Sequence, residues 1–218
     1  MRVRHSSGLG FTLIELLTCI GIIAVVCGIV FPVLVSAKRA AKQSVEISNL
    51  RQIGIAGALY HEENGSEPLG LPPLVPSRVP EELAVSPADS TKQGFANLVL
   101  DEISSGNSAY QQLKTAYRRT YIGFYDYGWT SDKWEACTTD APNPGWLISF
   151  TPSNFDPRFS IAKSTGRYHR LQMDGSVRDY QLKLITTPLG RAWWPVSFFV
   201  DINDLQEWNK THPKCSLQ

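Results

Sequence analysis

The stretch Gly10-Phe-Thr-Leu-Ile-Glu-Leu-Leu17 opens an apolar run that continues to Val35. Between Phe11 and Val35 the run holds one charged side chain, Glu15. A helix needs about 20 apolar residues to cross a bilayer, and this run has roughly 25. A single segment in lipid can pair its backbone amides only as a helix. The sequence therefore predicts a transmembrane helix over residues 11–35.

The residues around this helix predict its orientation. Arg2 and Arg4 precede it, and basic residues favour the cytoplasmic side, so we expect a cytoplasmic N-terminus and a periplasmic C-terminal region. A cleaved secretory signal would have an apolar core of about 7–15 residues followed by small residues. This run is longer, and residues 36–42 are basic, so the sequence favours a retained helix.

Glu15 needs a physical reason to lie in this run. A carboxylate costs about 2.5–3.5 kcal/mol at the middle of a membrane. Pairing with a cation about 4 Å away returns about 4 kcal/mol at an effective dielectric near 20. Two interpretations stay open from the residues alone: Glu15 reaches the headgroups, or it pairs with a cationic partner.

The ordered run resembles the N-terminus of type IV pilins and type II secretion pseudopilins. The matching residues are the basic leader 1–10 ending in Gly10, then Phe11, Glu15 and Pro32. The resemblance implies that a prepilin peptidase cleaves between Gly10 and Phe11 and N-methylates Phe11. It also implies that Glu15 neutralises the new amine of a neighbouring subunit. Pro32 stands where that family often has a helix-kinking proline, and proline in a helix permits a bend.

A second resemblance lies beyond the apolar run. Residues 48–54, Ser-Asn-Leu-Arg-Gln-Ile-Gly, followed by Tyr60, are similar to a segment of many pseudopilin-like proteins. Asp174-Gly175 fits the Asp-Gly turn that many of them carry near the C-terminus. Where those relatives place a His upstream of that turn, this chain has Ser164, which is a departure from the pattern.

The region after the membrane segment divides by composition. Residues 36–62 favour a helical spine, and residues 63–92 are a proline-rich, semi-extended connector. Gly54 and Gly57 would let a sheet approach the spine closely. The predicted packing stripe follows helical spacing and consists of Ile47, Leu50, Gly54 and Ala58, with Ile55 and Leu59 beside it.

Residues 93–218 predict a mixed outer domain. We expect short helices over 95–103 and 108–119 and strands over 146–151 and 197–202. A hairpin over 168–181 would turn at Asp174-Gly175 through a two-residue type I′ turn, which sets Arg170 opposite Asp179. The predicted fold class is α+β: a pilin-like long N-terminal helix packed on a small antiparallel sheet.

The four cysteines fall into two pairs. Cys19 and Cys27 lie in the apolar run, where cysteine behaves as a small apolar residue. Cys137 and Cys215 lie in the outer region, where oxidation is possible. The sequence leaves open whether these two form a disulfide, because it does not give their separation.

The composition argues against several classes of function. The 218-residue chain has 21 basic and 20 acidic residues, so it lacks the excess of basic residues that is typical of nucleic-acid-binding proteins. It carries no phosphate-binding loop, dinucleotide fingerprint or zinc-protease motif, so we expect no catalytic site, cofactor or enzyme activity. Oxygen ligands lie close together in sequence at Asp201, Asn203 and Asp204. Calcium is bound by about six to eight oxygen atoms, and these three residues alone do not make such a site. Side chains bonding turn amides are the favoured interpretation, so no metal site is predicted.

These observations predict a prepilin-like subunit of the bacterial inner membrane. Its expected partners are the prepilin peptidase, other pilin or pseudopilin subunits and the inner-membrane assembly platform. The alternative is a monomeric, membrane-anchored binding domain that uses prepilin processing only for sorting. The sequence does not distinguish a pilus from a secretion pseudopilus, a major from a minor subunit, or the partner of the outer domain.

Overall fold

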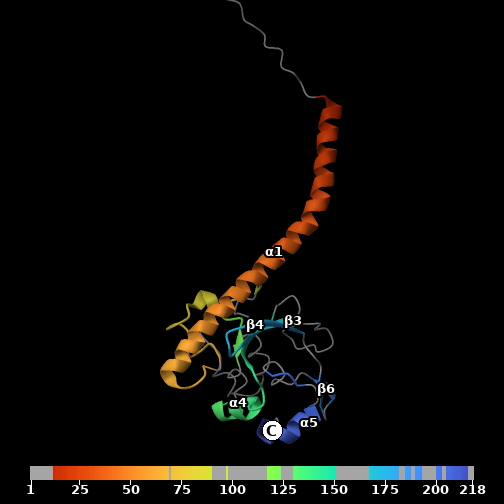
Figure 1. The fold of residues 1–218 in the computed structure, drawn as a ribbon. Coiled ribbons are helices and arrows are strands. Elements are labelled where there is room, and N and C mark those ends of the chain that lie inside the picture. The colour runs from red at the N-terminus through yellow and green to blue at the C-terminus, as the bar shows by residue number, and fades with distance from the viewer. Residues whose placement is uncertain are drawn as a thin grey trace, which may run out of the picture. The chain divides into compact units, whose positions relative to one another are not determined.

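The computed structural model describes residues 12–68, 70–89, 97, 117–123, 130–150, 167–181, 185–187, 190–192, 200–202 and 205–215. They form two compact units, one ending at Ala41 and one beginning at Lys42 (Figure 1). The described elements are α1 (Leu13–Asn64), η1 (Glu81–Ala84), β1 (Ile122–Gly123), α4 (Ser131–Thr138), β2 (Gly145–Phe150), β3 (Arg167–Gln172), β4 (Val177–Gln181), β5 (Ile185–Thr187), β6 (Gly190–Ala192), α5 (Leu205–Thr211) and η4 (Pro213–Cys215).

The strands form two antiparallel sheets. The larger one has four strands in the order β1-β2-β3-β4, and β5 pairs with β6 in a two-stranded sheet. Together with the long α1 this is the predicted α+β arrangement. The predicted strand that begins at residue 146 is β2, and the predicted helical spine over residues 36–62 is confirmed as part of α1, which ends at Asn64. Gly65 has φ +66°, and its N–H donates to the carbonyl of His61 at 2.8 Å, a common helix ending.

The β3–β4 hairpin forms where predicted, but its predicted register is wrong by one residue. His169 pairs with Asp179, and Arg170 lies opposite Arg178 rather than Asp179. The loop has three residues, 173–175, because Gly175 takes φ +78° and its N–H donates to the Gln172 carbonyl at 3.0 Å. A turn followed by a left-handed glycine is the usual form of three-residue hairpins.

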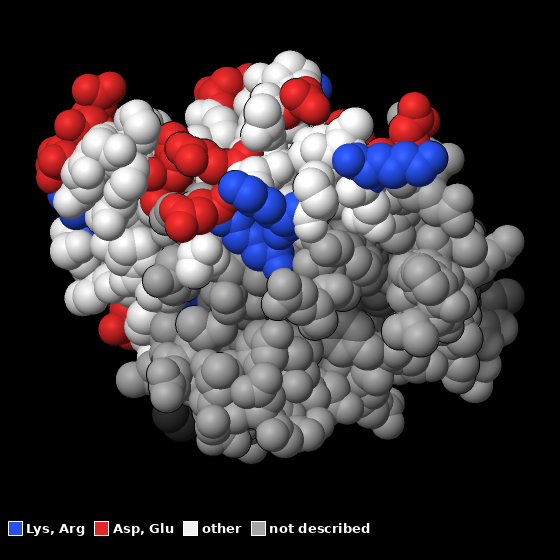
Figure 2. All heavy atoms as spheres, turned by 90° about the horizontal axis from the view of Figure 1, so that it is seen from below, with Lys and Arg blue, Asp and Glu red and all other residues white. Residues whose placement is uncertain are grey.

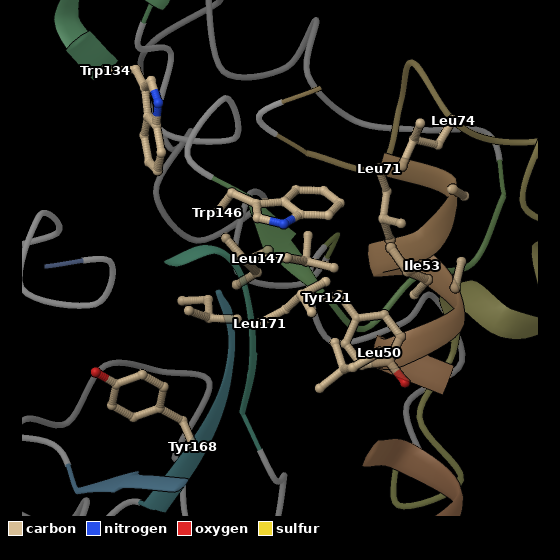
Figure 3. Close-up of a cluster of buried hydrophobic side chains, with 14 of the residues drawn as sticks. Leu50, Ile53, Leu71, Leu74, Tyr121, Trp134, Trp146, Leu147, Tyr168 and Leu171 are labelled. Atoms are coloured by element: carbon tan, nitrogen blue, oxygen red, sulfur yellow. The ribbon is translucent and has the colours of Figure 1, made fainter. Parts of the chain in front are cut away.

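The core lies between the sheet and the part of α1 that begins at Lys42 (Figure 3). Leu50 and Ile53 of α1 face Leu147 of β2 and Leu171 of β3, and all four are fully buried. Both predicted glycine approaches are confirmed. A Cβ at Gly54 would lie 3.1 Å from a Leu171 methyl carbon, and one at Gly57 only 2.8 Å from the Trp146 ring.

The predicted stripe on α1 is rotated relative to the buried face. Ile55 and Leu59 are 64% and 55% exposed, and Ala58 is exposed as well. The buried face instead consists of Glu46, Asn49, Leu50, Ile53, Gly54, Ala56 and Gly57. The expectation followed apolar residues only, whereas two polar residues belong to the buried face.

The proline-rich stretch after α1 contributes to the core. Residues 70–80 form turns, and Leu71, Leu74 and Val79 are buried (Figure 3 labels the two leucines). The short helix η1 follows and buries Ala84. This stretch therefore belongs to the same compact unit as the sheet.

Two further features concern the C-terminal part of the chain. Cys137 of α4 and Cys215 of η4 form a disulfide, with their Cα atoms 5.5 Å apart. The predicted helices 95–103 and 108–119 lie almost entirely outside the described residues. Of the predicted strand 197–202, only Val200–Ile202 are described, and they are not in a strand.

The charge of the unit that begins at Lys42 is mixed in sign. On the face seen from below, acidic and basic side chains of the described residues lie next to one another (Figure 2). This pattern agrees with the near-zero formal charge of the chain.

Candidate functional site

The structure describes two of the four predicted N-terminal site residues. Glu15 lies in the first turn of α1, and Pro32 lies inside the same helix. Gly10 and Phe11, the predicted cleavage junction, lie outside the described residues. The predictions for processing at this junction therefore stay predictions.

Glu15 and Thr12 cap the start of α1 reciprocally. The Thr12 backbone N–H and hydroxyl donate to Glu15 Oε2 at 2.8 and 2.7 Å, while the Glu15 N–H donates to the Thr12 hydroxyl at 3.3 Å. This is a capping box, which pairs amide groups that the first helical turn leaves without partners. The Thr-x-x-Glu spacing was a sequence signal for it, and it gives Glu15 a role in the folded helix.

Pro32 does not interrupt the helical assignment of α1. Its ring nitrogen has no hydrogen to donate to the carbonyl of Gly28, one turn earlier. The helix therefore lacks one backbone hydrogen bond at this point and continues on both sides of it.

The first part of α1 presents apolar side chains on all sides. Every residue from Thr12 to Ala41 is exposed, and α1 is long and apolar enough to cross a membrane. Large apolar side chains between 50% and 83% exposed are Leu13, Ile14, Leu16, Leu17, Ile20, Ile22, Ile23, Val25, Val26, Ile29, Val30, Phe31, Val33, Leu34 and Val35. An apolar surface of this extent marks contact with lipid or with protein.

A buried carboxylate joins α1 to the sheet. Glu46 is fully buried and accepts hydrogen bonds from Ser86 (2.6 Å), Ser149 of β2 (2.5 Å) and His169 Nδ1 of β3 (2.8 Å). We call these four residues the Glu46 cluster. An isolated buried charge is costly, and three donors compensate it here.

The other ring nitrogen of His169 faces outward from the cluster. Nε2 lies 3.2 Å from Asp179 Oδ1 and 3.2 Å from the Gln43 side-chain nitrogen. The three-residue hairpin loop makes this possible, because it sets His169 opposite Asp179. His169 therefore contacts Glu46 of α1 through one ring nitrogen and Asp179 of β4 through the other.

The surroundings of Glu46 favour its ionised form. Burial by itself raises the pKa of Glu46, but the hydrogen bonds from His169, Ser149 and Ser86 outweigh burial and hold the pKa below its ordinary value. Burial, together with the negative charge of Glu46, raises the pKa of the nearby Tyr121 hydroxyl. Glu46 is thus a buried anion at neutral pH.

The geometry of the Glu46 cluster fits a structural role better than nucleophilic catalysis. A serine nucleophile needs a hydrogen bond to its base. Here Ser149 and His169 both bond to the same oxygen of Glu46, and Ser149 is fully buried. The cluster ties a helix, two strands and the Ser86 turn together.

Among the described residues no group of three or more His, Cys, Asp or Glu side chains is placed to hold a metal ion. Asp201, from the sequence trio of oxygen ligands, accepts a hydrogen bond from Arg170 Nη2 at 3.0 Å. Asn203 and Asp204 lie outside the described residues.

The chain was compared with protein-family models, with curated proteins and with solved structures, and none of the three comparisons finds a match.

Proposed function

We propose that this chain is a prepilin-like subunit, processed between Gly10 and Phe11 and assembled through the first part of α1 into a filament. The prepilin peptidase, the other pilin or pseudopilin subunits and the inner-membrane assembly platform are its partners in this proposal. The filament belongs to a type IV pilus or a type II secretion pseudopilus.

One observation carries the proposal. A single continuous helix has an exposed, predominantly apolar first part with one carboxylate in its first turn, and a second part packed on a sheet. Such a helix can lie in the membrane before assembly and against other helices after it, because both surroundings accept apolar side chains. Glu15 is then placed to meet a cation at the start of the helix.

The second part of α1 adds support. Val45, Ile55 and Leu59 are 49%, 64% and 55% exposed although they lie beyond the apolar run. Lipid would not cover residues this far along the helix. Neighbouring subunits in a filament would cover these side chains, because their helices continue beside this one.

The test separates the charge of Glu15 from its capping role. Glu15→Gln removes the charge but keeps a capping-box side chain, since Gln is accepted at that position. Thr12→Ala removes the capping hydroxyl and keeps the charge. Both variants are expressed with the prepilin peptidase and assembly machinery, and the sheared filament fraction is assayed with the membrane fraction.

We expect both variants to insert and to be cleaved, with Glu15→Gln absent from filaments and Thr12→Ala present in them. Normal incorporation of Glu15→Gln would contradict the pairing role of Glu15. If the processed parent chain itself stays wholly in the membrane fraction, the monomeric membrane-anchored binding domain is the correct function.

A further inference from the structure

His169 of β3 lies between two carboxylates that come from different elements. Its Nδ1 is 2.8 Å from Glu46 Oε1 of α1, and its Nε2 is 3.2 Å from Asp179 Oδ1 of β4. The side chains of His169 and Glu46 are 4% and 0% exposed, whereas that of Asp179 is 41% exposed. The side-chain nitrogen of Gln43 of α1 lies 3.2 Å from the same Nε2. One ring nitrogen therefore has both an acceptor and a donor beside it.

A neutral His169 ring cannot donate to both carboxylates. A neutral imidazole carries one N–H and its other nitrogen accepts, whereas an imidazolium donates from both nitrogens. With one proton, a ring that donates from Nδ1 to Glu46 presents the lone pair of Nε2 to the Asp179 carboxylate. With two protons, both contacts become charge-assisted hydrogen bonds.

Gln43 supplies the partner that the neutral ring needs. Its side-chain nitrogen is a donor, and Nε2 of His169 accepts from it only when that nitrogen carries no proton. Gln43 is exposed, so its amide can bond to water when Nε2 holds a proton. The structure thus has a partner for each state of Nε2: Asp179 for the protonated state and Gln43 for the unprotonated state.

The groups around the ring favour the protonated state. Burial raises the pKa of Glu46, but its hydrogen bonds, that from His169 foremost, and the His169 charge hold this pKa below its ordinary value. Such coupling is reciprocal, so the Glu46 anion favours a proton on His169. The Ser149 hydroxyl of β2 is uncharged, and Tyr121 stays neutral because burial and the Glu46 charge raise the pKa of its hydroxyl. Asp179 adds a second negative charge from β4.

We propose that His169 is a pH switch in the joint between α1 and the β3–β4 hairpin. At neutral pH it is an imidazolium that donates to Glu46 and to Asp179. At higher pH its Nε2 gives up a proton to water, releases Asp179 and accepts from Gln43, while Nδ1 keeps its bond to Glu46. The switch acts on this joint whatever the first part of α1 assembles with.

The direction of the pH dependence follows from this arrangement. A histidine in an unfolded chain titrates near about pH 6.5. Because the folded chain holds the His169 proton more tightly, the added stability is full below about pH 6.5 and is lost as pH rises through the titration midpoint of the folded chain. The titration of Glu46 lies below its ordinary value of 4.5, so the two effects occupy separate pH ranges.

The test follows the ring nitrogens of His169 by NMR. The full-length chain, with isotope-labelled histidine, is held in dodecylphosphocholine micelles and titrated from about pH 5.5 to about pH 9, either side of the ordinary histidine value. Asp179→Asn removes one carboxylate, and Gln43→Met removes the donor at similar size. Glu62→Gln, at an exposed position about 24 Å along α1 from Glu46, is the matched control.

We expect both ring nitrogens to be protonated at neutral pH, with a titration midpoint at least about one pH unit above the ordinary value of about 6.5. Above that midpoint Nδ1 alone should carry a proton. Asp179→Asn should lower the midpoint by about one unit, a tenfold loss of proton affinity, and Gln43→Met should raise it. Glu62→Gln should leave it unchanged.

Urea unfolding across the same pH range is the second measurement. The parent chain should lose stability as pH rises through the midpoint, and Asp179→Asn should lose less. The proposal is overturned if His169 titrates at or below about pH 6.5, or if its high-pH form carries the proton on Nε2. It is also overturned if Asp179→Asn and Gln43→Met do not shift the midpoint in opposite directions.

Discussion

Replacing Glu46 by alanine tests how the helix is attached to the sheet. The change leaves three donors without their acceptor: the hydroxyls of Ser86 and Ser149 and Nδ1 of His169. A buried donor left without its acceptor costs about 1–3 kcal/mol, and because the serine hydroxyls can rotate we expect about 3–5 kcal/mol for the three together. For a unit of this size, about 1 kcal/mol shifts the unfolding midpoint by about 2–4 °C, so we expect a decrease of about 6–20 °C.

The assay is thermal unfolding of the full-length chain followed by tryptophan fluorescence, since Trp134 and Trp146 are buried in the unit that unfolds. Glu62→Ala, on an exposed position of the same helix, is the control and should change the midpoint little. Glu46→Gln should fall between the two, because the amide keeps one acceptor and both serine hydroxyls can rotate. If Glu46→Ala unfolds at the temperature of Glu62→Ala, the reasoning is refuted.

The same carboxylate predicts an acid dependence. The folded pKa of Glu46 is below its ordinary value of 4.5, so its contribution to stability is full above about pH 4.5 and is lost as pH falls through the folded pKa. His169 lies between two carboxylates, with Nδ1 2.8 Å from Glu46 and Nε2 3.2 Å from Asp179. Urea unfolding across acidic pH should therefore show a steeper loss of stability in the parent chain than in Glu46→Ala. Parallel curves for the two would contradict the prediction.

Three further changes test the packing, the disulfide and the hairpin. Gly57→Ala places a Cβ 2.8 Å from the Trp146 ring, and such overpacking should lower the free energy of unfolding by about 1–3 kcal/mol, measured in urea. Replacing Cys137 and Cys215 by serine opens a loop with a sequence separation of 78 and should lower stability by about 4–5 kcal/mol in the same assay. Gly175→Ala forces a side chain into φ +78° and should cost about 1–2 kcal/mol, again by urea unfolding.

Each of these changes has a matched control. Gly54→Ala, where the Cβ would lie 3.1 Å from a Leu171 methyl carbon that can move, should cost less than Gly57→Ala. Reduction of the parent chain should reproduce the double serine variant, and equal stability before and after reduction would exclude a stabilising disulfide. Gly175→Asn should be milder than Gly175→Ala, because asparagine tolerates the left-handed region; equal losses would argue against the three-residue loop.

The hairpin shows where sequence reasoning succeeded and where it stopped. Asp174-Gly175 marked the turn, since this pair is a strong hairpin signal. The same pair fits a two-residue and a three-residue loop, and the choice between them moves the whole register by one residue. The structure has the three-residue loop, in which the Gly175 N–H donates to the Gln172 carbonyl and His169 lies opposite Asp179.

The Glu46 cluster was not predicted for a related reason. Periodicity identified a helix but ranked its faces by apolar residues, which favoured Ile55 and Leu59 over Glu46 and Asn49. The partners of Glu46 lie 40, 103 and 123 residues away in the chain, so no local pattern marks it as a buried position. The capping box at Thr12 and Glu15, by contrast, is a local pattern that Thr-x-x-Glu spacing marks in sequence, although it was not among the predictions.

The central claim is tested most directly by the N-terminus of the chain after expression with an active prepilin peptidase. Intact-mass and peptide mass spectrometry of the membrane fraction would identify the first residue. We predict a mature chain that begins with N-methylated Phe11 and keeps the whole apolar run to Val35. An uncleaved Met1–Gly10 leader, or cleavage within or after the apolar run, would contradict it.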